Sequence, residues 1–99
     1  MKLFLDDRRT PPDKSFCVAR NYDECIKLLG LICFEYASLD FDLGEYYNGL
    51  HVLEWMVENH RIPDRINIHS SHSMGILKMR RYIDAFFPTG YEYSVHMLP

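Results

Sequence analysis

The sequence contains few cysteines and no long apolar segment, and these absences exclude several protein classes. Only three cysteines, Cys17, Cys25 and Cys33, occur in 99 residues, eight positions apart and without a C-x-x-C pair. A disulfide framework or a zinc knuckle requires other spacings. No stretch approaches the length of a membrane-spanning helix, and the segment MKLFLDD has too few apolar residues for a signal peptide. We therefore expect a cytoplasmic protein with buried, reduced thiols and no membrane association.

An excess of positive charge is also missing. The formal net charge is −3, which argues against binding long duplex nucleic acid, because proteins that do so carry extended basic surfaces. A small phosphate ligand is not excluded, since its site needs only a few local charges. Hydrophobic residues make up 47% and charged residues 25% of the chain, as is typical of a globular protein. The length predicts one domain, residues 1–99.

Short apolar strands alternate with amphipathic helical segments along the chain. We expect strands at 3–5, 16–20, 36–40, 66–70 and 91–97, and helices that begin after Asn21, after Asn48 and after Ser71 or Ser73. This alternation predicts an α/β fold with a single, mostly parallel five-stranded sheet in three layers, similar to receiver and flavodoxin-like folds. The paired prolines of RRTPPDK forbid a helix after the first strand. We therefore expect no helix between the first and second strands.

Polar side chains end three of the expected strands. Asp6 and Asp7 follow the first strand, Asp40 ends the third, and a His-Ser pair ends the fourth. The carboxyl ends of parallel strands meet at one edge of a sheet, where ligands bind. Carboxylates gathered there repel one another unless a cation lies among them, and oxygen ligands favour Mg²⁺ or Mn²⁺. Asp6, Asp7 and Asp40 are the expected metal ligands, and Asp42 either joins them or caps the following turn.

Five neighbouring side chains each have two interpretations. His69 is either a proton donor or acceptor in catalysis or a core histidine bonded to the backbone. Ser70 either contacts a phosphate or caps a helix. Arg8 and Arg9 either bind a phosphate or pair with the acids. His72 is either a functional proton carrier or an exposed loop histidine.

The positions of Asp6–Asp7, Asp40, Gly49 and Ser70 resemble the signature of response-regulator receiver domains. The resemblance implies that the acidic pair holds Mg²⁺, that Asp40 accepts a phosphoryl group, and that the Ser70 hydroxyl contacts it. Two features depart from that family. Only 33 positions separate Asp7 from Asp40, too few for the helix that normally follows the first strand. The last expected strand also lacks the lysine with which receivers contact the phosphoryl group.

Five segments are similar to a narrower family, the cyclic-phosphate processing receiver-like domains, which lack that first helix. The segments are LFLDDRRTPP, VARNYDECIKLL, SLDFDLG, NGLHVLEWM and INIHSS…MG, so the likeness runs from about Lys2 to Ile83. It implies a protein that processes cyclic phosphates, such as those at RNA ends. Members commonly read L-D-H-D-L-G where this chain has Phe41, and Asn-Pro where Ser71 is followed by His72. The first change removes a proton carrier, and His72 is the candidate to replace it.

These observations predict a metal-dependent hydrolase, a phosphoesterase that opens a cyclic phosphate with Mg²⁺ or Mn²⁺ as cofactor. The expected catalytic residues are Asp40, His69, Ser70 and His72, with Arg8, Arg9 and Ser70 on the phosphate. In one variant Asp40 attacks as a nucleophile. The expected partner is a small phosphate-containing substrate. Tyr46 and Tyr47 either stack on the base of this substrate or pack against their own loop. Two other functions remain open: a degenerate receiver module phosphorylated at Asp40, and a non-catalytic domain that binds a nucleotide or a protein.

Overall fold

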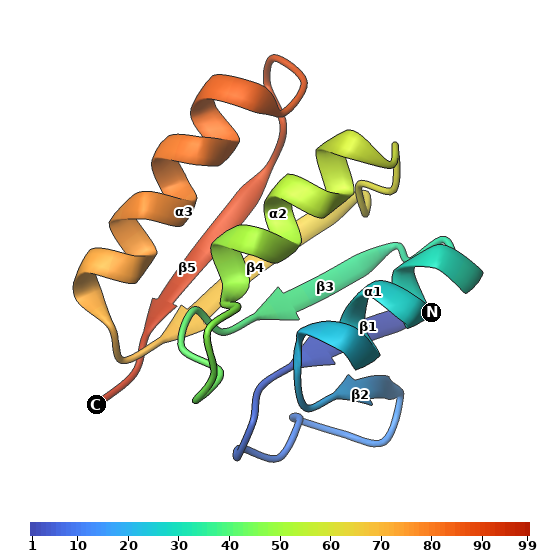
Figure 1. Ribbon diagram of the computed structural model, residues 1–99, viewed down its shortest axis with the longest axis vertical. Coiled ribbons are helices and arrows are strands. Elements are labelled where there is room, and N and C mark those ends of the chain that lie inside the picture. The colour runs from blue at the N-terminus through green and yellow to red at the C-terminus, as the bar shows by residue number, and fades with distance from the viewer.

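The computed structural model describes residues 1–99 as a parallel sheet with helices packed against it (Figure 1). The strands are β1 (Lys2–Leu5), β2 (Phe16–Ala19), β3 (Tyr36–Leu39), β4 (Arg65–Ser70) and β5 (Tyr93–Met97). The helices are α1 (Tyr22–Leu31), α2 (Gly49–Glu58) and α3 (Ser73–Phe86). None of these helices has the length and apolar composition that spanning a bilayer requires.

The sheet has the strand order β2-β1-β3-β4-β5, and every neighbouring pair is parallel. This confirms the predicted α/β fold and five-stranded sheet. The connection from β1 to β2 contains no helix, as the proline-rich loop predicted. Each of the three later connections contains one helix, so the chain follows the β-α-β pattern from β2 onwards.

The helices cover only one face of the sheet. From β2 to β3, β4 and β5 the chain always steps in the same direction across the sheet, and right-handed crossovers then place all three helices on the same side. In agreement, α1 packs against α2 and α2 packs against α3. The expectation of three layers is therefore wrong. The step from β1 to β2 runs in the opposite direction. A helix in this connection would lie on the other face of the sheet, but the connection contains none.

The hydrophobic core lies between the sheet and the helices. Side chains alternate between the two faces of each strand, so Leu3 and Leu5 point into the core, where both are fully buried. Of the three free cysteines, only Cys25 is buried, and burial raises the pKa of its thiol to about 12. Cys33 is exposed, so the expectation of buried thiols is wrong for that residue.

Side chains at the helix N-termini explain where the helices begin. The Asn21 side chain accepts a hydrogen bond from the Glu24 N–H and caps α1, and Asn48 caps α2, both as predicted. The α3 cap is His72 rather than either predicted serine: its Nδ1 accepts from the Gly75 N–H at 2.8 Å. A neutral imidazole nitrogen without a proton accepts this bond as a serine oxygen would.

Candidate functional site

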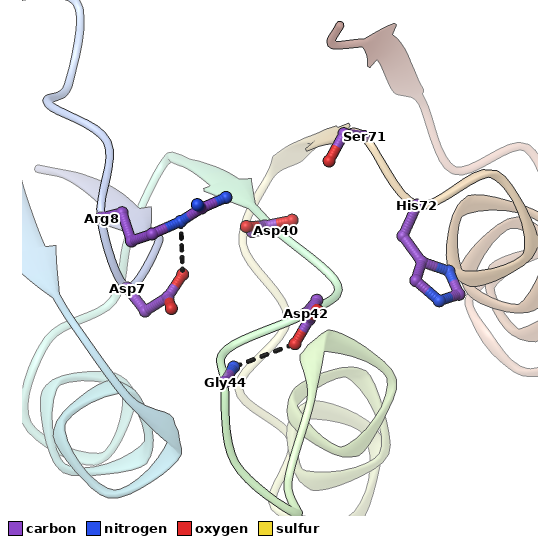
Figure 2. Close-up of a pocket in the computed structure, with 7 residues that line it drawn as sticks. All are labelled: Asp7, Arg8, Asp40, Asp42, Gly44, Ser71 and His72. Atoms are coloured by element: carbon purple, nitrogen blue, oxygen red, sulfur yellow. Dashed lines mark hydrogen bonds and ion pairs between the residues drawn. The ribbon is translucent and has the colours of Figure 1, made fainter.

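An acidic cavity of about 350 Å³ opens where β1, β3 and β4 end (Figure 2). Its lining contains no hydrophobic residue and consists of Asp7, Arg8, Asp40, Asp42, Gly44, Ser71 and His72. The predicted meeting of the polar strand ends at one edge of the sheet is thus present in the structure. The lining also places carboxylates opposite a histidine, as Figure 2 shows for Asp42 and His72.

Asp40 is the buried carboxylate of this cavity, with 3% of the residue exposed. Its Oδ1 accepts from the Phe41 N–H at 2.8 Å and its Oδ2 from Nη1 of Arg9 at 3.3 Å. Burial raises the pKa of Asp40 above its ordinary value, a hydrogen bond from the Ser70 hydroxyl lowers it, and the Asp6 charge raises it further. The net rise means that the Asp40 anion is disfavoured here, so a neighbouring cation stabilises it.

Asp6 lies beside Asp40 but is occupied by hydrogen bonds. Its Oδ1 accepts from the N–H groups of Arg8 and Arg9 at 2.9 and 2.8 Å, and its Oδ2 accepts from Nη1 of Arg9 at 3.1 Å. Nε2 of His69 lies 2.9 Å from the same Oδ2. Burial raises the pKa of Asp6, but the hydrogen bonds from Arg9, Arg8 and His69 outweigh it and hold the pKa below its ordinary value. Asp6 is therefore ionised and acts only as an acceptor.

Arg9 is the cation that already balances these two acids. Its Nη1 bridges Asp6 and Asp40. Of the two roles expected for Arg9, the structure therefore shows the pairing with the acids. The loop that carries it is fixed by Arg20, whose Nη1 donates to the carbonyl oxygens of Asp6 and Arg9. Arg8 differs: 73% of its side chain is exposed, it lines the acidic cavity, and its Nε lies 4.0 Å from Asp7. Arg8 is thus the arginine placed to meet a ligand in that cavity.

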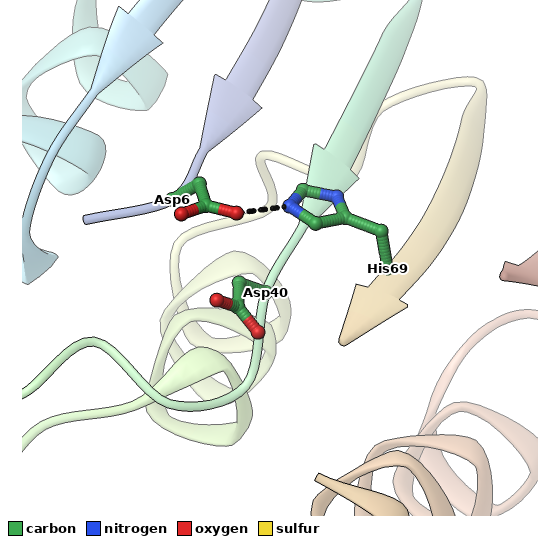
Figure 3. A group of neighbouring side chains, drawn as sticks. All are labelled: Asp6, Asp40 and His69. Carbon is green, nitrogen blue, oxygen red and sulfur yellow. Dashed lines mark hydrogen bonds and ion pairs between the residues drawn. The ribbon is translucent and has the colours of Figure 1, made fainter. Parts of the chain in front are cut away.

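Two groups of side chains are candidates for a divalent cation. Asp6, Asp40 and His69 offer ligand atoms within 4.8 Å of one another (Figure 3). Because the ionised Asp6 can only accept, His69 Nε2 carries a proton, and a protonated nitrogen cannot bind a metal. The second group, Asp7 and Asp40 with Asp42 beside them, lines the acidic cavity with carboxylate oxygens alone. Such a set fits Mg²⁺ or Mn²⁺ better than the first.

His69 lies outside the acidic cavity, on the helix-free face of the sheet. Its Nδ1 lies 2.6 Å from the Ser38 hydroxyl, and its ring stacks on Phe4 at 4.8 Å and 8°. Burial lowers the pKa of His69, although hydrogen bonding and charge from Asp6 oppose the shift. Both ring nitrogens are thus occupied. The structure separates His69 from the cavity where sequence analysis placed a proton carrier.

Ser71 lines the acidic cavity, whereas the predicted site residue Ser70 does not. Ser70 is 1% exposed and does not line the cavity. Its Oγ accepts from the His72 N–H at 3.1 Å, and its hydroxyl lowers the pKa of Asp40, so Ser70 acts on the site only through these neighbours. Ser71 lines the cavity and was not among the predicted site residues. The signal that could have indicated it is the pair of neighbouring serines, Ser70 and Ser71, where β4 ends.

Asp42 and Gly44 shape the rim of the cavity. Asp42 Oδ1 accepts from the Gly44 N–H at 2.9 Å, so its side chain caps the turn while also lining the cavity (Figure 2). Gly44 has φ +68°, and a Cβ built there would lie 3.1 Å from Oδ2 of Asp7. A glycine at this position therefore leaves room for the Asp7 carboxylate.

His72 reaches the cavity from the start of α3, beside Phe41. The Phe41 and His72 rings are 4.9 Å apart, and a Cβ at Gly75 would lie 2.2 Å from the Phe41 ring. Because Nδ1 of His72 accepts the Gly75 N–H, the neutral imidazole carries its proton on Nε2. His72 thus presents an N–H donor next to Phe41.

Comparison with known proteins places the chain in a family. The family described as the cyclic-phosphate processing receiver domain matches residues 1–85. No curated protein and no solved structure matches the chain. The match extends from β1 to the last turn of α3 and includes every residue of the acidic cavity. This chain therefore belongs to the cyclic-phosphate processing receiver domain family.

Proposed function

We propose that this protein is a metal-dependent phosphoesterase that opens a cyclic phosphate in the acidic cavity. The observation that carries the proposal is the composition of that cavity, where Asp7 and Asp40 share one lining with Arg8 and His72. The carboxylates suit a divalent cation, the guanidinium suits a phosphate oxygen, and the imidazole suits a departing alkoxide. Membership of the cyclic-phosphate processing family supports the choice of substrate.

Asp7 and Asp40 are the proposed ligands of Mg²⁺ or Mn²⁺. When bound, this ion supplies Lewis acidity at the phosphoryl group and lowers the pKa of a coordinated water. Asp6 supports the site indirectly, since it orients Arg9 against Asp40. Both Asp40 oxygens already accept hydrogen bonds, which favours the role of a fixed ligand over that of a nucleophile.

The chain's own polar groups position the phosphate and move the proton. Arg8 and Ser71 bind the non-bridging phosphate oxygens from the rim. A water oxygen attacks phosphorus and one ring P–O bond breaks, so that the cyclic diester becomes a monoester. The departing sugar oxygen takes the proton from Nε2 of His72, and the attacking water supplies a proton in return. The sum is the addition of one water molecule across the P–O bond.

The direct test is phosphorus NMR of the purified protein with 2′,3′-cyclic AMP, with and without Mg²⁺. We expect the cyclic signal to be replaced by a monoester signal only when the metal is present. Asp40→Asn should abolish the conversion, whereas Asp64→Asn, an exposed aspartate in the loop before β4, should retain it. An unchanged cyclic signal, together with stable labelling of Asp40 by acetyl phosphate, would instead establish the receiver function.

A further inference from the structure

A second cavity, of about 400 Å³, lies on the face of the sheet that carries no helix. It extends from β2 to β5 and is bounded on one side by the loop after β1. The residues that matter for its chemistry are Phe4, Phe16, Tyr36, Ser38, Asn67 and His96. Its volume falls in the range of about 300–1,000 Å³ that is usual for small-molecule sites.

Three aromatic rings form one wall of this open-face cavity. Phe4 and Phe16 meet edge to face with centroids 6.0 Å apart, and Phe16 meets Tyr36 at the same distance. Phe16 and Tyr36 are only partly buried, so ring surface remains accessible. Lys2 adds a positive charge 5.2 Å from the Phe16 centroid. Exposed rings on an open sheet are the surface on which unpaired nucleic-acid bases stack.

Polar groups with fixed donor and acceptor roles line the cavity opposite this wall. Asn67 is buried; its Nδ2 donates to Ser38 Oγ at 3.1 Å, and its Oδ1 lies 2.6 Å from Nδ1 of His96. An amide oxygen can only accept, so His96 Nδ1 carries the proton and its Nε2 is left as an acceptor in the neutral ring. A ligand edge that carries an amino group matches this acceptor.

Arg9 connects the open-face cavity to a residue of the acidic cavity. Arg9 lines the open-face cavity, and its Nη1 donates at 3.3 Å to Asp40, which lines the acidic cavity. A ligand whose phosphate binds in the acidic cavity therefore has an aromatic cavity on the other side of the Arg9 side chain. The pair of cavities offers separate surroundings for a charged group and a flat ring.

We propose that the open-face cavity binds the nucleobase of the substrate, an inference that rests on the proposed function for its choice of ligand. The base stacks on Phe16 and Tyr36, and its polar edge meets the acceptor of His96. The substrate class is then a nucleotide or an RNA end, and not a base-free sugar phosphate. Tyr46 and Tyr47 are the competing aromatic pair, but Tyr47 already stacks on Tyr22 at 4.4 Å and 14°.

The test compares two tyrosine variants with a ligand that a cyclic-phosphate esterase cannot convert, adenosine 3′-monophosphate. NMR titration should give about a ten-fold weaker Kd for Tyr36→Ala, as expected for a lost stacking contact. Tyr46→Ala removes an equally large ring that is 81% exposed, and its Kd should equal that of the wild type. Tyr36→Phe should bind like the wild type, because the ring and not the hydroxyl makes the contact, and amide NMR signals of Tyr36→Ala dispersed as in the wild type exclude a folding defect.

The same titration contains the results that overturn the inference. Unchanged affinity in Tyr36→Ala, or adenine-proton NOEs to Tyr46 and none to Phe16 or Tyr36, would place the base elsewhere. The outcome is independent of hydrolysis. A protein that shows the NOEs but leaves cyclic AMP intact loses the proposed function and keeps the base site. A protein that hydrolyses cyclic AMP without them loses the base site alone.

Discussion

Asp6 and Asp40 share a single guanidinium nitrogen: Nη1 of Arg9 lies 3.1 Å from Oδ2 of the first and 3.3 Å from Oδ2 of the second. Both carboxylates are almost fully buried, whereas 28% of the Arg9 side chain is exposed. Two neighbouring buried carboxylates repel each other strongly. The positive charge of Arg9 offsets this repulsion, which would otherwise destabilise the fold. The proposed cation at Asp7 and Asp40 would share this task.

Arg9→Ala should destabilise the metal-free protein by about 2–4 kcal/mol, because it leaves buried carboxylates without their partner. Urea denaturation measures this loss. Adding Mg²⁺ should recover part of it if the ion binds at Asp40, since a second cation then replaces the missing charge.

Arg8→Ala is the matched control, because Arg8 is mostly exposed and its contact with Asp7 is long. We expect it to change stability by less than about 1 kcal/mol. If the stability loss of Arg9→Ala is the same with and without Mg²⁺, the ion does not compensate charge at Asp40, and the ligand assignment is wrong.

The two proposed tasks of His72 can be separated by substitution. Asn is a strong N-cap, so His72→Asn should keep the α3 cap and the stability of the protein while removing the proton donor. The hydrolysis rate should then fall about 100-fold or more, the usual contribution of a general acid. His72→Ala should lose a similar rate and also about 0.5–2 kcal/mol of stability. A His72→Asn protein with the full rate would leave His72 as a cap alone.

Much of the fold followed from local sequence patterns. The alternation of apolar strands with helical segments indicated the parallel sheet, and parallel strands bring Asp7 and Asp40 to one edge whatever the strand order. Asn21 and Asn48 indicated two helix starts because their side chains satisfy free N–H groups. These features depend on neighbours in sequence or on a general property of parallel sheets.

The features that sequence analysis missed depend on direction and on side-chain facing. The number of layers depends on whether successive crossovers step the same way, which no local pattern encodes. His69 and Ser70 are adjacent in β4, and successive side chains of a strand point to opposite faces. His69 therefore meets Phe4 on the helix-free face, whereas the Ser70 hydroxyl accepts from the His72 N–H. Their adjacency in sequence suggested one site, and the pleat of the strand separates them.

Alanine substitutions at Gly44 and Gly90 can be compared to test the role of the Asp7 carboxylate in the acidic cavity. Both have positive φ, +68° and +79°, but a Cβ at Gly44 would lie 3.1 Å from Asp7 Oδ2 and one at Gly90 would meet nothing within 4 Å. Each alanine variant should lose about 1–2 kcal/mol of stability from backbone strain. Only Gly44→Ala should also weaken Mg²⁺ binding, which calorimetric titration measures. Equal Mg²⁺ affinity in both variants would show that Asp7 is not displaced or is not a ligand.

Tyr91 provides a test of the fold away from the proposed site. Its hydroxyl donates to the Pro63 carbonyl at 2.6 Å, and burial raises the pKa of Tyr91 well above its ordinary value, with the Asp64 charge adding to the shift. In the unfolded chain the phenol loses its proton near pH 10, whereas the folded protein retains it. Above that pH the unfolded state binds fewer protons, so the free energy of unfolding should fall as pH rises.

Tyr91→Phe removes this titration and isolates the effect from that of other tyrosines. At about pH 8 the wild type should be more stable than Tyr91→Phe by about 1 kcal/mol, the worth of one hydrogen bond. At about pH 11 the difference should shrink, because only the wild type must keep a phenol protonated there. Urea denaturation of both proteins across this range measures the difference directly. A difference that does not change with pH would mean that Tyr91 titrates in the folded protein as it does in the unfolded chain, and that its hydroxyl is not buried.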